Sequence, residues 1–246
     1  MNALQKIIIY IKMSTKAIFD KPSLQTLAGI IKFFPAWWRH LASGRNSISD
    51  KMPWLSFGAI EYLKKIIEPD MQVFEYGSGG STLFWASRVR QVFSIEHDKA
   101  WFDKLQDHFT RNEIKNVKYE FIAAEVDHRN VPRQYGNPND YVSADENFNG
   151  KSFELYAKRI DEYPNEYFDI VIVDGRARPS CILHAITKVK RGGYLIVDNS
   201  ERDYYFSSFS FNKSDWKKIE FLGPVPYVFH FSKTTIIKKI NAIEKL

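Results

Sequence analysis

An acidic residue and two glycines stand where a predicted strand gives way to a predicted helix. The segment VFEYGSGGST begins with the β-prone pair Val73 and Phe74 and continues through Glu75, Gly77 and Gly79. Glycines in such a turn let the backbone bend sharply and approach a ligand closely. Free N–H groups at the start of the next helix attract a negative group. The spacing therefore predicts a nucleotide-like cofactor over this turn.

The neighbouring residues distinguish between two kinds of cofactor that bind over such a turn. A dinucleotide motif carries a third glycine where this chain has Thr82, whereas an acid at the strand end, Glu75, suits the ammonium group of S-adenosylmethionine. The next predicted strand ends in Glu96, whose carboxylate can accept hydrogen bonds from the ribose hydroxyls of either cofactor. The pattern favours S-adenosylmethionine and leaves a nicotinamide-dependent oxidoreductase as the alternative.

A second group of oxygen-bearing side chains follows two later predicted strands. Asp174 stands at the end of the run YFDIVIVDG, and Asp198 and Asn199 end the run GYLIVDN. Because the carboxyl ends of neighbouring parallel strands meet at one edge of a sheet, these three side chains are expected to lie together. Their oxygens suit Mg²⁺ or another hard divalent cation, which can lower the pKa of a bound hydroxyl.

Nearby arginines can instead neutralise these acids, and this interpretation stays open beside the first. Proton removal then falls to a carboxylate of the following segment SERDYY, either Glu201 or Asp203. The arginines concerned are Arg176, Arg178 and Arg202. The catalytic candidates are Asp174, Asp198 and Glu201, and the metal ligands of the first interpretation are Asp174, Asp198 and Asn199.

Strands and helices alternate at short spacing from about residue 52 onward. The strands are predicted at 72–77, 91–98, 117–124, 167–175 and 193–199, with helix-prone segments between them. This order is typical of a doubly wound α/β sheet. The segment 218–240 holds two β-rich runs around a Gly-Pro turn with no helix between them, which predicts a closing antiparallel hairpin.

Four segments, VFEYGSGGST, SIEHD, DIVIVDGRAR and GGYLIVDNSE, resemble the successive motifs of class I S-adenosylmethionine-dependent methyltransferases over about residues 52–240. The resemblance implies a Rossmann-like, doubly wound sheet of seven mostly parallel strands with the last strand antiparallel, in a methyltransferase domain at 52–246. The cofactor-binding residues that it implies are Glu75, Gly77, Ser78 and Gly79 for the methionine part, Ser81 at the start of the helix, Glu96 for the ribose and Glu125 near the adenine.

The acceptor is expected to be an oxygen of a small molecule or glycan. The spacing of Asp174 and the Asp198-Asn199 pair is similar to that in metal-dependent O-methyltransferases of the catechol and macrolide-sugar type. Enzymes that methylate nucleic-acid amines follow this strand with an Asn/Asp-Pro-Pro-aromatic turn, whereas this chain has Asp-Gly-Arg-Ala at 174–177. No basic stripe accompanies the motifs, so a nucleic-acid partner is not expected.

A polar insertion at 126–165 is expected on the substrate side of the sheet. Its first part, 126–150, is rich in Asn, Gly and Pro, and loops of this length usually act as lids or stay disordered. The side chains expected near a sugar or an anionic group are Arg129, Arg133, Tyr135 and Tyr141.

The first 51 residues are predicted to form a basic helical arm. Residues 1–45 hold seven Lys or Arg against one Asp, which accounts for the whole net charge of +6, and the rest of the chain is neutral. The apolar spacing predicts one helix that ends at Pro22 and a second that Ser23 caps and that ends before Pro35.

Two roles are open for this arm. It packs on the domain or on a second subunit of a homo-oligomer, or it rests on an anionic membrane with Phe33, Phe34, Trp37 and Trp38 at the interface. Its apolar runs are too short for a signal peptide or a membrane span. A single cysteine, Cys181, fits a reducing compartment. We therefore expect a cytoplasmic protein, free or on the inner face of a membrane. A non-catalytic membrane-associated module with the same fold is a further alternative.

Overall fold

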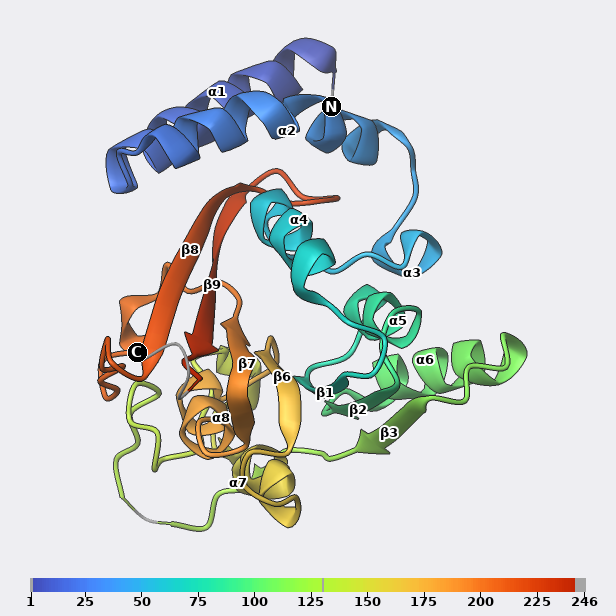
Figure 1. Cartoon of the computed structure of the whole chain (residues 1–246), viewed down its shortest axis with the longest axis vertical. Helices are drawn as coiled ribbons and strands as arrows, with labels where there is room; N and C mark the ends of the chain where they lie inside the picture. Colours follow the sequence, from blue (N-terminus) through green and yellow to red (C-terminus); the bar gives the residue numbers. More distant parts are fainter. Residues whose placement is uncertain (1, 130, 242–246) are drawn as a thin grey trace.

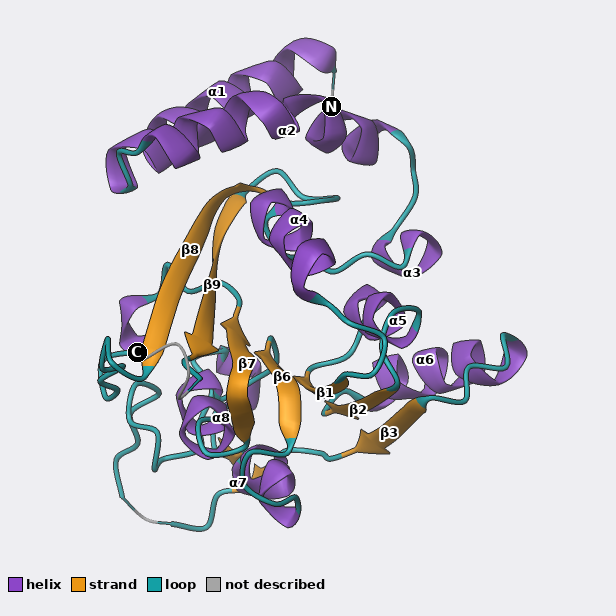
Figure 2. Cartoon of the chain, viewed as in Figure 1, coloured by secondary structure: helices purple, strands orange, loops and turns teal. Residues whose placement is uncertain are grey.

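The computed structural model describes residues 2–129 and 131–241, and at its centre is a seven-stranded sheet (Figures 1 and 2). Its strands are β1 (Gln72–Tyr76), β2 (Gln91–Glu96), β3 (Val117–Phe121), β6 (Phe168–Val173), β7 (Val189–Val197), β8 (Trp216–Pro224) and β9 (Phe231–Lys239). They lie in the order β3-β2-β1-β6-β7-β9-β8. The first five are parallel, and β9 is antiparallel to both β7 and β8. The predicted doubly wound, mostly parallel sheet with an antiparallel last strand is confirmed.

Alternating residues of the central strands explain why both faces of the sheet are covered. On β1, Val73 packs with α4 (Phe57–Ile66) and α5 (Gly80–Ala86). Phe74 points to the opposite face and packs with α7 (Glu154–Lys158) and α8 (Arg178–Ala185). The helix α6 (Lys99–Arg111) covers the outer strands β2 and β3. Two buried apolar layers therefore hold the strand ends in fixed positions.

The arm is a pair of helices that lie side by side across one end of the molecule (Figure 1). Helix α1 (Ala3–Asp20) ends before Pro22, and α2 (Leu24–Ala42) begins with Ser23 as its N-cap, as predicted. The pair packs on the sheet through a buried cluster that contains Tyr10, Trp37 and Phe57. The indole Nε1 of Trp37 donates a hydrogen bond of 2.9 Å to the carbonyl of Val228, between β8 and β9. The arm therefore packs on the domain, and a short helix α3 (Ser47–Asp50) connects it to α4.

The predicted end of the second arm helix at Pro35 is wrong, because α2 continues through this proline to Ala42. A proline inside a helix removes one backbone hydrogen bond. Pro35 is on the exposed side of α2, where water can bind the backbone carbonyl that receives no N–H from the proline. Trp37, one half-turn later and fully buried, anchors the continuation of the helix.

The insertion has little regular structure of its own. The strands β4 (Glu125–Val126) and β5 (Lys151–Ser152) form a separate antiparallel pair that joins its two ends. Between them lies a 3₁₀ turn, η1 (Glu146–Phe148), and after α7 comes a second one, η2 (Arg159–Glu162). The chain thus returns to β6 after a long loop over the carboxyl edge of the sheet.

Candidate active site

The glycine turn between β1 and α5 adopts a backbone that only glycine fits well. Gly77 has φ 87°, and a Cβ atom there would lie 2.9 Å from the backbone of Gly175, which follows β6. A Cβ on Gly80 would lie 2.3 Å from the carbonyl oxygen of Ser47. The turn is therefore wedged between the end of β6 and the connection from the arm. The turn faces the carboxyl edge of the sheet, and its own N–H groups donate to Ile95, Glu96 and Thr82.

Glu96, at the end of β2, organises this turn. Its Oε2 accepts hydrogen bonds from the backbone N–H and the hydroxyl of Ser78, at 2.9 and 2.7 Å. Its Oε1 accepts from the backbone N–H groups of His97 and Asp98. Burial opposes ionisation of Glu96, but these hydrogen bonds and the nearby His97 outweigh it and lower the pKa of Glu96 to about 2. Glu96 is thus a fixed negative charge beside the turn.

Glu75 lies one layer behind the turn and is fully buried. Its Oε2 accepts hydrogen bonds from the hydroxyl of Thr82 at 2.5 Å and from that of Ser94 at 2.7 Å, which ties α5 to β2. Its Oε1 has no partner within the described residues. Burial raises the pKa of Glu75 to about 7, against the effect of these hydroxyl donors. The carboxylate thus supports the turn from below.

A cavity of about 640 Å³ opens at the carboxyl edge, over the glycine turn. The predicted site residues that line it are Gly77, Ser78, Gly79, Ser81, Glu96, Asp174, Asp198, Asn199 and Glu201. Sequence reasoning missed Trp54 before α4, Trp101 on α6, and Val225, Val228 and His230 between β8 and β9. No motif in the sequence marks these residues, since they reach the cavity only through the packing of distant segments.

The structure places Glu125 away from the cavity, contrary to its predicted position near an adenine. Glu125 is exposed in β4, where it pairs with Ser152. The prediction extended the third strand to residue 124, but β3 ends at Phe121, so the chain has already turned away from the site at Glu125.

Arg178 occupies the edge between the ends of β6 and β7. Its buried guanidinium donates to the backbone carbonyls of Gly175, Asp174 and Asp198, and its Nη2 lies 2.9 Å from the Asp174 carboxylate. Burial raises the pKa of Asp174, and Arg178 and Arg176 oppose this increase. The geometry therefore matches the interpretation in which an arginine neutralises these acids.

Asp198 and Asn199 are held by β9. The Oδ1 of Asp198 accepts a hydrogen bond of 2.7 Å from Thr234, and the amide of Asn199 donates to Ser232. Burial, together with the negative charge of Asp174, raises the pKa of Asp198 to about 8, against the effect of Arg178 and of the Thr234 hydrogen bond.

The side-chain oxygens of Asp174, Asp198 and Asn199 do not fit the predicted divalent-cation site. The guanidinium of Arg178 already lies against the Asp174 carboxylate, and a second positive charge there would be repelled. In residues 2–129 and 131–241, no three His, Cys, Asp or Glu side chains cluster so that they could hold a metal ion.

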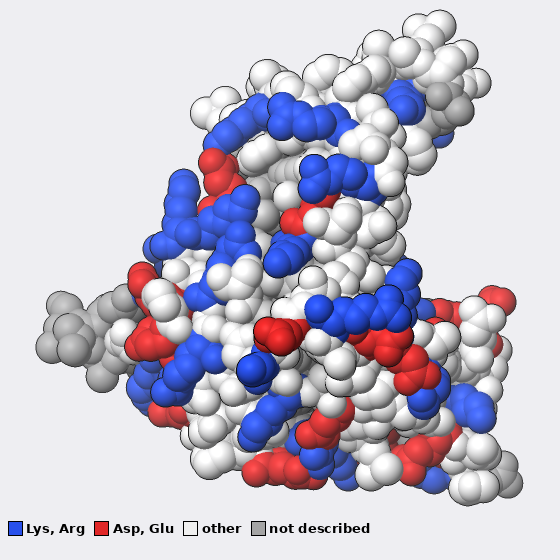
Figure 3. All heavy atoms as spheres, turned by 90° about the vertical axis from the view of Figure 1, so that its right-hand side faces the viewer, with Lys and Arg blue, Asp and Glu red and all other residues white. Residues whose placement is uncertain are grey.

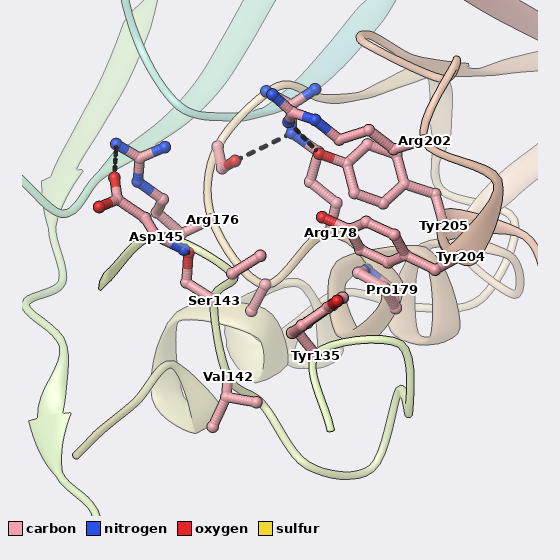
Figure 4. Close-up of a pocket in the computed structure, with 13 residues that line it drawn as sticks. Tyr135, Val142, Ser143, Asp145, Arg176, Arg178, Pro179, Arg202, Tyr204 and Tyr205 are labelled. Carbon is pink, nitrogen blue, oxygen red and sulfur yellow. Dashed lines mark hydrogen bonds and ion pairs between the residues drawn. The ribbon is translucent and has the colours of Figure 1, made fainter. Parts of the chain in front are cut away.

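A second pocket, of about 350 Å³, adjoins the cavity and shares Gly175, Arg176, Arg178 and Arg202 with it. Arg176, paired with Asp145 at 2.9 Å, lies on one side of the pocket, and Arg202 with Tyr205 lies on the other (Figure 4). Three tyrosines contribute to the walls: Tyr135, Tyr204 and Tyr205. The pocket therefore combines aromatic rings with guanidinium groups.

Of the four insertion side chains expected near a substrate, only Tyr135 lines this pocket. Arg129 and Arg133 instead form ion pairs inside the insertion, both with Asp127. Tyr141 is buried, and its ring packs against His184. The arginines that do face the pocket come from the segments after β6 and β7.

The fold of the chain is similar to that of a solved structure. A putative methyltransferase from Streptococcus mutans in complex with SAH aligns at a TM-score of 0.50 and 13% identity, over 74% of this chain and 96% of that chain. The chain has the class I methyltransferase fold. An rRNA methylase from Streptococcus thermophilus aligns at 0.47 and 14% identity, over 75% and 95%. No protein-family model and no curated protein matches the sequence.

Proposed function

We propose that the protein is an S-adenosylmethionine-dependent methyltransferase. The observation that carries this proposal is the cavity in which the glycine turn, Glu96 and the edge carboxylates meet. The close-packed turn at Gly77 and the N–H groups at the start of α5 can bind the methionine end of the cofactor. The carboxylate of Glu96 can accept hydrogen bonds from the cofactor's ribose hydroxyls. Such a cofactor supplies a methyl group on a positively charged sulfur. The adjoining arginine-lined pocket is where we place the acceptor.

The residues around the shared wall of the two pockets must position the acceptor and remove its proton. When bound, S-adenosylmethionine would supply the methyl group to the acceptor oxygen, and its sulfur would keep the electron pair of the broken carbon–sulfur bond. We assign the proton to Asp198, whose raised pKa suits a general base near neutral pH. Arg178 holds Asp174 and the backbone of both strand ends in place.

The acceptor that this pocket suits best is a small molecule or glycan that carries a negative group beside the reacting oxygen. Arg202 donates to the hydroxyl of Tyr205 at 2.6 Å, and within the described residues it forms no ion pair with a carboxylate. Its charge is therefore available to an anionic ligand. The tyrosine rings offer surfaces on which a sugar or an aromatic ring can pack.

The cofactor assignment predicts selective stabilisation. S-adenosylmethionine and S-adenosylhomocysteine should raise the melting temperature, and at about 100 times Kd the stabilisation would be about 2.7 kcal/mol. NAD should have no effect. Glu96→Gln should weaken binding of S-adenosylhomocysteine by roughly 10- to 100-fold, since it removes hydrogen bonds to a charged acceptor and disturbs Ser78. Calorimetric titration measures the affinities for S-adenosylhomocysteine and for NAD.

Glu125→Gln is the matched control, because it makes the same chemical change at an exposed position outside the cavity. Its affinity for S-adenosylhomocysteine should equal that of the wild type. Binding of NAD instead, or equal affinity in the Glu96→Gln and wild-type proteins, would contradict the assignment.

The pocket assignment predicts binding of anions. Inorganic pyrophosphate should raise the melting temperature of the wild type more than sodium chloride at the same ionic strength. Arg202→Gln should weaken pyrophosphate binding by about tenfold, the effect of losing charge-assisted hydrogen bonds. Arg129→Gln, whose arginine is engaged inside the insertion, is the control and should bind as the wild type does. Equal pyrophosphate binding by Arg202→Gln and the wild type would remove the anionic acceptor from the proposal.

A further inference from the structure

The outward side of the arm carries large apolar residues that are exposed. They recur at helical spacing along both arm helices, so they form one stripe on each. Phe19 and Leu24, at the turn between the helices, are 86% and 85% exposed. The stripes consist of Leu4, Ile7, Ile8, Ile11, Ile18 and Phe19 on α1, and Leu24, Leu27 and Ile31 on α2.

Both helices are apolar on their inner side as well. Tyr10 and Ala17 of α1 and Ile30 and Trp37 of α2 face the sheet and are buried. A helix on the surface of a water-soluble domain normally has one apolar face and one polar face. A second apolar face over two adjacent helices marks a surface that is covered by something else.

The charge around the stripes indicates what covers them. The arm carries the whole net charge of the chain, +6, and Lys12 and Arg39 lie on the exposed sides of its helices, whereas the exposed Lys16 pairs with Asp20. Figure 3 shows mostly uncharged and basic atoms over the arm at the top of the molecule, whereas acidic side chains gather lower down. Within residues 2–129 and 131–241, no helix is long and apolar enough to cross a membrane.

We propose that the outward face of α1 and α2 lies on an anionic lipid bilayer, with the apolar stripes in the interface and the basic side chains beside lipid phosphates. This combination of an apolar face with flanking Lys and Arg is the one that binds such surfaces. Of the aromatics predicted at the interface, Trp37 is buried against the sheet, and Phe33, Phe34 and Trp38 are only partly exposed. The residues that enter the bilayer are the aliphatic side chains of the stripes and Phe19.

The same arm contacts the wall of the cofactor cavity. Trp37 binds the carbonyl of Val228, and the hydroxyl of Tyr227 donates to Asp50 at 2.6 Å, beside the arm. Val228 lines the cavity. A bilayer under α1 and α2 would therefore hold the catalytic domain in one orientation rather than on a flexible tether.

Sedimentation with vesicles tests this docking on the full-length protein. Wild type should sediment with vesicles of phosphatidylcholine and phosphatidylglycerol and remain in solution with phosphatidylcholine alone. Binding should weaken as salt rises, because charges are screened beyond about 8 Å at physiological ionic strength. The triple variant Ile8→Gln, Ile11→Gln and Phe19→Gln should lose at least about tenfold in affinity. Its melting temperature should stay unchanged, since all three side chains are exposed.

The matched control is Val126→Gln, Val131→Gln and Leu155→Gln, which makes three similar changes at exposed positions outside the arm. It should bind vesicles as the wild type does. Lys12→Glu with Arg39→Glu should weaken binding to anionic vesicles without altering the stripes. The proposal is overturned if wild type ignores anionic vesicles at low salt, or if the stripe variant binds them equally. Light scattering that shows a wild-type dimer, a monomeric stripe variant and no lipid binding would assign the face to a second copy.

Discussion

Replacement of Arg178 by alanine is expected to lower the free energy of unfolding by about 3–5 kcal/mol, the cost of breaking a buried ion pair from one side. The buried guanidinium binds the carbonyls of Gly175, Asp174 and Asp198 and the carboxylate of Asp174. Without it, the Asp174 carboxylate loses its positive neighbour and three backbone oxygens lose their donor. Urea unfolding at neutral pH measures the loss, and cofactor binding should fail with it, since these strand ends form the cavity.

Arg176→Ala is the matched control for this effect. Its side chain is 37% exposed and pairs with Asp145 on the pocket wall, so the stability change should stay below about 1 kcal/mol. A further test lowers the pH: protonation of Asp174 removes the uncompensated charge, and the loss of unfolding free energy in Arg178→Ala should shrink. If Arg178→Ala unfolds like the wild type, Arg178 does not hold the two strand ends together.

Local sequence signals were sufficient for the sheet and for half of the cavity. Strands and helices alternate along the chain with apolar periods that the backbone geometry imposes, and this alternation predicted the doubly wound, mostly parallel sheet. Gly77, Gly79 and Glu96 were predicted to meet because each closes a strand or follows one. All three line the cavity. These residues are positioned by neighbours that are close in the chain or in the sheet register.

The remaining features depend on contacts between distant segments, which no local pattern specifies. The sequence left open which arginine pairs with which acid, and only the packing of α8 against β6 and β7 brings Arg178 to both strand ends. Trp54 and Val228 enter the cavity from segments that carry no motif. Pro35 illustrates the reverse case: a strong local stop signal was overridden by the burial of Trp37.

Asp198→Asn is expected to reduce kcat by about 10²- to 10⁴-fold, the usual contribution of a general base. It should leave the affinity for S-adenosylhomocysteine nearly normal, because the amide keeps the shape of the carboxylate and can accept from Thr234. In the wild type, kcat should rise with pH and level off above about 8, where Asp198 loses its proton. This rise should be absent in the variant. Glu201→Gln is the control, because Glu201 also lines the cavity but binds the backbone N–H of Lys233.

The pH dependence of stability reports the protonation of Asp198 and can be measured without a substrate. The folded protein holds this proton up to about pH 8, whereas the unfolded chain releases it near 3.8. Between these values the folded state binds more protons, so this group makes the unfolding free energy fall as pH rises. Asn does not titrate, so the melting temperature of Asp198→Asn relative to wild type should increase from pH 5 to pH 8. A constant difference would show that Asp198 is already ionised at pH 5, and a kcat loss in Glu201→Gln alone would assign the base to Glu201.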